Sequence, residues 1–461
     1  MKKNIITLTD SYKETHWQML TKGTEYVYSY FESRNGAKFN KTVFFGLQYF
    51  LKEYLEGKVV SREKIIAADK LCKAHFGNGN LFNREMWEYI LDKYDGKLPI
   101  AIKAVPEGTA IPVSNVLMTV VNTDPKCAPL TNCLETLLSQ IWAASTTATL
   151  SYEIYKLIEY YRDQTGNRDG IKFGLHCFGF RGVSSVESAG VVGAGHLINF
   201  LGSDTLKAME VAMEYYNAPI DGLAYSVPAT EHSIMCSMGP EGESDLFGNL
   251  LKTYPTGILS VVIDSYDYKN FVSNIAKKYK EEILARDGKV VFRPDSGDPT
   301  STTLEVFNSL AEVFGTTTNA KFFKELNPKV GCLWGDGIDY DGIRSILFTL
   351  KNNMYSTNSI VFGAGGGLLQ KTNRDVQRFA FKSSAQCRDG VWHDVFKKPL
   401  DISKVSKKGQ LKLVRDGSAN GGYQTVNITD PRQDELVEVF RDGVILKEYT
   451  FDEVRKNVGT W

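Results

Sequence analysis

The sequence has no excess of charge of either sign. Its 461 residues contain 54 Lys and Arg in total and 54 Asp and Glu in total, so the formal net charge is zero. This balance argues against the broad basic face that nucleic-acid binding requires. We therefore expect no nucleic-acid partner, whereas a small basic cluster would still suit a phosphorylated metabolite.

Long hydrophobic runs are also absent. No stretch approaches the roughly 20 apolar residues that a membrane-spanning helix needs. The first ten residues, MKKNIITLTD, contain two lysines but no long apolar region of the kind that a secretory signal carries. These absences predict a cytoplasmic protein with no membrane partner.

Cysteine is sparse and lacks any C-x-x-C spacing. The seven cysteines are Cys72, Cys127, Cys133, Cys177, Cys236, Cys332 and Cys387. An odd number of scattered cysteines argues against a disulfide scaffold and against a zinc site, and favours a reducing compartment.

The chain does contain a series of short apolar runs from about residue 171 onward. Each run ends in polar or glycine-rich residues, and helical patterns fit between several of them. Strands that alternate with helices predict a parallel sheet, and this many units favour a barrel. The runs lie at 171–175, 196–201, 222–227, 258–263, 290–292, 331–334 and 359–362.

We therefore predict an α/β fold with two domains. Residues 166–375 are expected to form a TIM-like (β/α) barrel, and residues 1–165 together with 376–461 a second, α+β domain. The second domain has a long helical pattern at 129–161 and strand patterns in its tail, such as GQLKLVRDG and YQTVNITD. In barrel enzymes the active site lies at the carboxyl ends of the strands, so the polar residues after each run are the candidate site.

The last run opens into the stretch FGAGGGLLQK at 362–371. It matches neither G-x-G-x-x-G nor the P-loop pattern, and an ordinary tight turn is the alternative. Its place after the last strand favours a phosphate site, because barrel folds often bind phosphate there at a helix start. Lys371 and Arg374 follow closely and would pair with the same anion.

Charged residues follow several other runs. Arg293 and Asp295 flank a proline in VVFRPDSGDP, and three more acids occupy equivalent places: Asp204, Asp264 and Asp336. Four acids at one mouth repel one another unless cations lie near them. Arg181, Arg293 and a bound Mg²⁺ would supply those cations, whereas the alternative is a set of ordinary surface pairs.

Two further candidates lie beside the same strand ends. His232, in PATEHS, is either a structural histidine or a nucleophile or acid–base group next to the phosphate site. Phe178 and Phe180, in CFGFRG, are either core residues or flat surfaces on which an aromatic ligand stacks. The residues by themselves thus predict a barrel enzyme that acts on a phosphorylated, Mg²⁺-bound substrate.

An ordered set of segments resembles the nicotinamide phosphoribosyltransferase family, among the type II phosphoribosyltransferases. The segments are LTDSYKETH, VYSYFESR, FGFRGVSSVESAG, GSDT, YSVPATEHS, DSYD, RPDSG, GDG, FGAGGGLLQK and VFKKPLDISKVSKKGQL. The resemblance implies an enzyme of NAD salvage that makes nicotinamide mononucleotide and pyrophosphate from nicotinamide and 5-phosphoribosyl 1-pyrophosphate. It also implies Mg²⁺, ATP as an activating co-substrate, and a homodimer whose active sites are shared across the interface.

The resemblance assigns a role to each matching position. Phe178 and the partner's Tyr12 would sandwich the pyridine ring, with Asp10 in the same partner-supplied segment. Asp204 would accept a hydrogen bond from the carboxamide, and Arg293 would lie beside the ring.

Phosphate positions follow in the same way from the resemblance. They are Arg181, Gly365, Gly366, Arg374 and Lys382. Gly335, Asp336, Asp264 and Asp295 would surround the ribose and the pyrophosphate, the last two as Mg²⁺ ligands. His232, with Asp264 and Asp295 as the catalytic set, would be phosphorylated from ATP.

Three departures from the family pattern, at Cys177, Trp334 and Ala364, affect only the fine tuning of the site. One alternative is nicotinate phosphoribosyltransferase, against which Asp204 argues because a carboxylate repels nicotinate. The other is a non-catalytic barrel that binds sugar phosphates, and the retained Asp, Arg and His residues argue against it.

Overall fold

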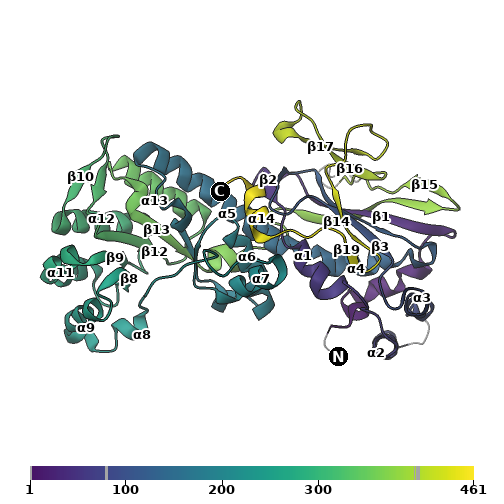
Figure 1. The fold of residues 1–461 in the computed structure, drawn as a ribbon, viewed down its shortest axis with the longest axis horizontal. Coiled ribbons are helices and arrows are strands. Elements are labelled where there is room, and N and C mark those ends of the chain that lie inside the picture. The colour runs from purple at the N-terminus through teal and green to yellow at the C-terminus, as the bar shows by residue number, and fades with distance from the viewer. Residues whose placement is uncertain (1–2, 78–80, 399, 401–404) are drawn as a thin grey trace.

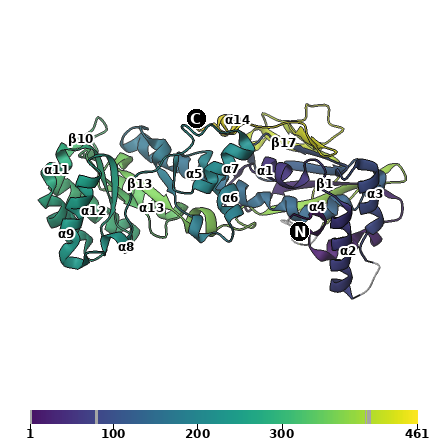
Figure 2. The same cartoon turned by 60° about the horizontal axis from the view of Figure 1, so that its bottom comes forward.

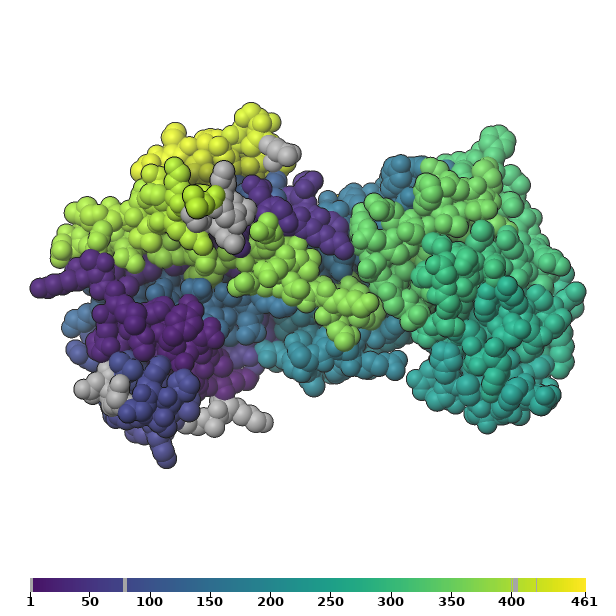
Figure 3. All heavy atoms as spheres, turned by 180° about the vertical axis from the view of Figure 1, so that it is seen from behind, coloured from purple at the N-terminus to yellow at the C-terminus, as the bar shows by residue number. Residues whose placement is uncertain are grey.

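Two separate sheets organise the chain, and they lie toward opposite ends of an elongated molecule in both ribbon views (Figures 1 and 2). The computed structural model describes residues 3–77, 81–398, 400 and 405–461, so part of the segment VFKKPLDISKVSKKGQL lies outside the described residues. Figure 3, which shows the molecule from behind, reveals a narrow waist between the two ends. Within the described ranges, no helix combines the length and the apolar character that crossing a membrane would require.

The first sheet is antiparallel and joins the two ends of the sequence. Its order is β15 (Val391–Asp394), β14 (Phe379–Arg388), β1 (Thr24–Ser33), β5 (Val116–Asn122), β3 (Ile100–Ala104), β18 (Val437–Arg441) and β19 (Val444–Ile445). Strand β1 is buried on both faces because helices cover one side and the hairpin of β16 (Leu411–Arg415) and β17 (Tyr423–Asn427) covers the other (Figure 1). The strand patterns expected in the tail are therefore confirmed.

The second sheet is parallel, with the order β7 (Gly202–Ser203), β6 (Leu175–Cys177), β13 (Ile360–Ala364), β12 (Val330–Trp334), β9 (Asp287–Arg293) and β8 (Thr256–Val262). Segment 225–230 joins its two edges through parallel bridges, from Tyr225 to Gly202 and from Ala229 to Ser260. The sheet thus curls into a ring, which we call the parallel ring. The expected TIM-like barrel is found only in this coarser form, because the described residues give six strands and one irregular segment rather than eight regular β/α units.

Helices connect and cover the two sheets. They are α1 (Leu47–Phe50), α2 (Arg62–Phe76), α3 (Arg84–Tyr94), α4 (Leu130–Ser139), α5 (Ile141–Thr165), α6 (Val186–Leu197), α7 (Leu206–Tyr216), α8 (His232–Met235), α9 (Gly239–Thr253), α10 (Tyr268–Asn270), α11 (Lys280–Ala285), α12 (Pro299–Phe314), α13 (Tyr340–Asn352) and α14 (Phe451–Val458). Short strands form two further pairs, β2 (Lys41–Val43) with β4 (Ala110–Pro112), and β10 (Thr316–Thr318) with β11 (Lys324–Leu326).

Helix α5 links the two hydrophobic cores. Its residues Ile141, Ala144 and Ala148 belong to the core of the first sheet, whereas its buried residues Leu150, Ile154, Tyr155, Ile158 and Tyr161 belong to the core of the parallel ring. The helical pattern predicted for 129–161 is therefore real, but it is divided between α4 and α5 at Gln140. One long helix thus fixes how the two cores meet.

Two of the predicted strands, at 196–201 and 222–227, are wrong, and a third is displaced. Run 196–201 begins at the end of α6 and continues as irregular chain, and run 222–227 forms only an isolated bridge at Tyr225. Run 171–175 is mainly a 3-10 helix and reaches β6 only at its last residue. His196 is fully buried, with Nε2 2.9 Å from the Gly202 carbonyl oxygen and Nδ1 3.1 Å from Ser151 Oγ. A helix end that is buried on all sides is as apolar as a buried strand, so periodicity does not separate the two.

Candidate active site

The carboxyl ends of the ring strands bring most of the predicted site residues to one rim. Phe178 follows β6, Asp204 follows β7, Asp264 follows β8, and Arg293 ends β9. Asp336 follows β12, and Gly365, Gly366 and Gly367 of the FGAGGG stretch follow β13. Parallel strands point their carboxyl ends the same way, so residues far apart in sequence share this rim.

His232 lies between two carboxylates at the rim. It begins α8, and its Nε2 is 3.3 Å from Oδ1 of Asp264, while its Nδ1 is 4.0 Å from Oδ2 of Asp295. The His232 side chain is 47% exposed, whereas that of Asp264 is only 4% exposed. Ser296 donates a hydrogen bond to Asp264. The imidazole is thus accessible to a ligand while a fixed, buried carboxylate orients it.

Arg293 contacts both Asp295 and the aromatic ring of Phe178. Its Nη2 donates to Oδ1 of Asp295 at 2.8 Å, and its guanidinium lies 5.2 Å from the centre of the Phe178 ring. The Nε–H of Arg293 is buried and has no hydrogen-bond partner. A buried donor without a partner is costly, so this atom is a natural place for an acceptor on a bound ligand.

Asp204 is held in its charged form at the same rim. Its Oδ1 lies 3.0 Å from Nε2 of His176 and accepts a hydrogen bond from Ser226. Burial by itself raises the pKa of Asp204, but His176, Ser226 and the charge of Arg293 outweigh burial and hold the pKa below its ordinary value. The rim therefore presents a hydrogen-bond acceptor beside Phe178.

His176 and Ser226 were not predicted as site residues. The signal for His176 is weak but present, because it stands two residues before Phe178 and a strand directs alternate residues to one face. Ser226 lies in the irregular segment that closes the ring, so nothing in its local sequence marks it.

The residues of the parallel ring that were predicted to bind phosphate lie in turns. Gly365 precedes the π-helical turn Gly366–Gln370, and Arg181 lies in the 3-10 turn Phe180–Gly182. Arg181 is exposed and forms no ion pair with any described residue. The side-chain oxygen of Gln370 would lie 2.2 Å from a Cβ atom on Gly182, so the two turns are in direct contact.

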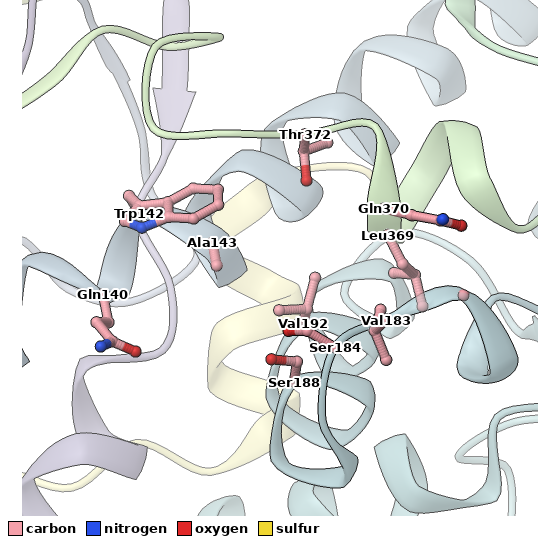
Figure 4. Close-up of a pocket in the computed structure, with 11 residues that line it drawn as sticks. Gln140, Trp142, Ala143, Val183, Ser184, Ser188, Val192, Leu369, Gln370 and Thr372 are labelled. Carbon is pink, nitrogen blue, oxygen red and sulfur yellow. The ribbon is translucent and has the colours of Figure 1, made fainter.

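Figure 4 shows a hollow next to these turns, lined by residues around the start of α5, by residues of the segment 182–192, and by Leu369, Gln370 and Thr372. Its volume is about 460 Å³. The polar lining consists of hydroxyl and amide groups from Gln140, Ser184, Ser188, Gln370 and Thr372. None of the described side chains that line it is charged, so its chemistry does not suit a phosphate group.

The interior of the parallel ring is hollow as well. A cavity of about 360 Å³ runs behind the rim, and both His176 and Ser226 line it. Most of its remaining wall is apolar, but Lys289 contributes a cation. Burial lowers the pKa of Lys289, and the nearby charge of Arg162 lowers it further. The ring thus encloses a lined cavity rather than a filled barrel core.

The other predicted residues lie on the first sheet and its helices. Asp10 and Tyr12 stand at the start of the 3-10 helix Ser11–Gln18, where Asp10 accepts a hydrogen bond from Thr136 at 3.1 Å. Tyr12 is 56% exposed. Lys382 lies on β14, opposite Tyr30 of β1. Among the described residues, no hydrogen bond or ion pair links these side chains to the ring rim.

A basic cluster surrounds Lys382. Burial lowers the pKa of Lys382, and Lys397, Arg34 and Arg374 lower it further, while Glu135 opposes them. Arg34 and Lys397 were not predicted, because each is an ordinary basic residue in the sequence until the fold brings it to β14. Four cations outnumber the two nearby carboxylates, Glu135 and Asp375, and suit a ligand that carries several negative charges. We call these four residues the basic cluster.

No group of three or more His, Cys, Asp or Glu residues has the arrangement of a metal site anywhere in the described ranges. The oxygen atoms of Asp264 and Asp295 nevertheless face the same imidazole. Mg²⁺ prefers one or two carboxylates together with waters and substrate phosphates, and this donor set fits that mode of binding.

Comparison with known families and structures agrees with this geometry. Residues 173–443 match the family model described as nicotinate phosphoribosyltransferase (NAPRTase), and residues 4–102 match that of the nicotinamide phosphoribosyltransferase N-terminal domain. The chain is 42% identical over 464 aligned positions to nicotinamide phosphoribosyltransferase of Xanthomonas campestris pv. campestris (strain 8004), covering 98% of this chain and 97% of that protein. It is 34% identical to nicotinamide phosphoribosyltransferase of Acinetobacter baylyi, with 99% of this chain and 97% of that protein covered.

Solved structures show the same fold at low identity. Nicotinate-nucleotide pyrophosphorylase from Pyrococcus furiosus aligns with a TM-score of 0.63 at 16% identity, over 99% of this chain and 95% of that one. Human nicotinic acid phosphoribosyltransferase aligns with a TM-score of 0.57 at 14% identity, over 98% and 92% of the two chains. The family match covers more than half of the sequence, and the chain therefore belongs to the nicotinate phosphoribosyltransferase family.

Proposed function

We propose that this protein is a nicotinamide phosphoribosyltransferase, which forms nicotinamide mononucleotide and pyrophosphate from nicotinamide and 5-phosphoribosyl 1-pyrophosphate. The observation that carries the proposal is the charged acceptor Asp204 at the rim beside Phe178 and Arg293. A carboxylate accepts a hydrogen bond from a carboxamide but repels the carboxylate of nicotinate. The full-length relatives named for the nicotinamide reaction support the same choice.

The residues suit a displacement at C1 of the ribose. The bond from C1 to the pyrophosphate oxygen breaks and its electron pair leaves with pyrophosphate, while the lone pair of the pyridine nitrogen forms the new bond to C1. Positive charge develops on the sugar ring, as in glycoside transfer. Phe178 and Arg293 would hold the base, and the cations would neutralise the leaving group.

Magnesium and ATP belong to this proposal. Asp264 and Asp295 would hold Mg²⁺ together with phosphate oxygens, and the ion would supply positive charge to the leaving pyrophosphate. His232, exposed between those two carboxylates, would accept a phosphoryl group from ATP and couple its hydrolysis to synthesis.

A homodimer completes the proposed site. Asp10 and Tyr12 lie at the start of the 3-10 helix Ser11–Gln18 and Lys382 lies on β14, at the first-sheet end of the molecule (Figure 1). The charge of Arg374 acts on Lys382 and lowers its pKa. A second copy would bring these residues to the rim as a second wall of the base site and as further phosphate ligands.

The deciding experiment offers purified protein nicotinamide or nicotinate, each with the phosphoribosyl donor and Mg²⁺. We expect pyrophosphate release with nicotinamide, together with nicotinamide mononucleotide in equal amount. A preference for nicotinate would establish the acid-specific reaction instead, and no release with either base would favour a sugar-phosphate-binding protein.

A further inference from the structure

We infer that Gly363, together with Gly335, positions the Phe178 ring for the base and does so by having no side chain. This inference rests on the proposed function, because it concerns the same base site. Neither glycine was selected for this role by the sequence patterns, and Gly363 was not predicted to be a site residue at all.

The Phe178 ring lies across the neighbouring strand β13. The backbone N–H of Phe178 donates to the Ala364 carbonyl oxygen at 3.2 Å, which places the end of β6 against β13. A Cβ atom on Gly363 would lie 2.1 Å from Cε1 and 2.7 Å from Cζ of the ring. Atoms do not approach so closely without repulsion, so any side chain at position 363 must displace the ring.

The same end of the Phe178 ring also meets the residue that follows β12. A Cβ atom on Gly335 would lie 3.3 Å from Cζ of Phe178 and 3.0 Å from Nε of Arg293. The guanidinium of Arg293 lies 5.2 Å from the ring centre. The Cζ end of the ring is therefore bounded by Gly363 and by Gly335, and alanine at position 335 would push mainly on Arg293.

Backbone conformation does not explain these glycines. Neither Gly335 nor Gly363 has a positive φ, unlike 21 other glycines in the described part of the chain, so both backbones suit any residue. Phe178 also lies outside both buried hydrophobic cores. The two positions are glycine because the Phe178 ring needs the space that a side chain would fill. Displacement of the Phe178 ring would therefore affect the base site rather than a hydrophobic core.

The chain offers a matched control in Gly331, which precedes Gly335 on the same face of β12. A Cβ atom on Gly331 would have its nearest neighbours at 3.4 and 3.5 Å, which is ordinary contact distance. Gly331→Ala, Gly335→Ala and Gly363→Ala therefore form a graded series in one environment, with no, moderate and severe crowding.

Steady-state kinetics of the three variants test the inference. We expect Gly363→Ala to raise KM for nicotinamide about tenfold, the equivalent of one lost aromatic stacking contact, and to leave KM for the phosphoribosyl donor nearly unchanged. Gly335→Ala should have a smaller effect and Gly331→Ala none. Equal KM values for nicotinamide in wild type and Gly363→Ala would overturn the inference, whereas an inactive wild type would overturn the proposed function.

A double-mutant cycle isolates the ring as the cause. In a Phe178→Ala background, Gly363→Ala has nothing to displace and should add no further increase in KM for nicotinamide. Additive effects would show that Gly363 acts by another route and would overturn the inference. If Gly363→Ala alone fails to fold, the comparison of Phe178→Ala with the double variant still decides, because neither variant contains the clash.

Discussion

The Nε2 atom of His232 lies 3.3 Å from Oδ1 of the buried Asp264 carboxylate. Ser296 holds the other oxygen of that carboxylate, so Asp264 is fixed and the imidazole is oriented by it. A histidine of this kind has one nitrogen anchored and the rest of its ring open to a ligand.

Transfer of phosphate to His232 is the first prediction. Incubation with γ-labelled ATP should give an acid-labile phosphoprotein, because phosphohistidine is hydrolysed in acid. His232→Ala should abolish the label while slow synthesis of the mononucleotide remains. Asp264→Asn should reduce labelling, since the amide orients the imidazole less firmly than the carboxylate does. Full labelling of His232→Ala would contradict the assignment.

Asp204 should set the preference for the amide base. Asp204→Ser removes the repulsion of nicotinate, so the ratio of kcat/KM for nicotinamide over that for nicotinate should fall at least about tenfold. Ser226→Ala, which removes only one support of Asp204, should lower this ratio less. Competition between the two bases in one assay measures the ratio directly. An unchanged ratio in Asp204→Ser would show that selectivity lies elsewhere.

The basic cluster should lower the stability of the ligand-free protein and strengthen its binding of anions. Lys382 is half-buried near three other cations, so Lys382→Met should raise the melting temperature of the ligand-free protein. Pyrophosphate should stabilise wild type by binding the folded state, and this shift should shrink in Lys382→Met. Thermal melts with and without pyrophosphate measure both effects, with the exposed Lys70→Met as control. A lower melting temperature for ligand-free Lys382→Met would contradict the expected repulsion.

Glu107 should give the stability a distinct pH dependence. Burial raises the pKa of Glu107 from 4.5 to about 7, against hydrogen bonds from Gly46, Gln48 and Tyr216. Between pH 4.5 and 7 the folded state therefore holds more protons than the unfolded state, and the free energy of unfolding falls as pH rises through this window.

Glu107→Gln removes this titration, so its unfolding free energy should fall less between pH 4.5 and 7. The variant should also be less stable in absolute terms, because the new amide group faces donors instead of accepting from them. Denaturant melts at several pH values measure the slope, with the exposed Glu241→Gln as control. Identical slopes for wild type and Glu107→Gln would exclude Glu107 as the cause.

Much of the parallel ring was predictable because its strands β8, β9, β12 and β13 are short apolar runs with a clear end. Run 196–201 was mistaken for a strand because the buried end of α6 is as apolar as a strand. Closure of the ring by segment 225–230 was beyond sequence reasoning, because only two isolated bridges mark it.

The meeting of Asp264 and Asp295 followed from strand ends alone, because parallel strands must share an edge. His232 joins them from the end of the irregular segment that closes the ring. The residues that support these site residues could not be predicted from strand ends. Ser226 reaches Asp204 from an irregular segment, and Arg34 joins the basic cluster only through the pairing of β1 with β14. Contacts of this kind depend on tertiary structure and leave no local pattern.

The division of the predicted site between the two ends of the molecule has a genetic consequence. In the proposed dimer, Arg293→Ala damages the active site at the rim of the chain that carries it. Lys382→Ala instead damages the active site at the rim of the partner chain, to which Lys382 contributes. A mixed pair then holds one site with both defects and one intact site, so random mixing should restore about a quarter of wild-type activity. Two alleles that each encode a dead enzyme can therefore complement one another in a single cell.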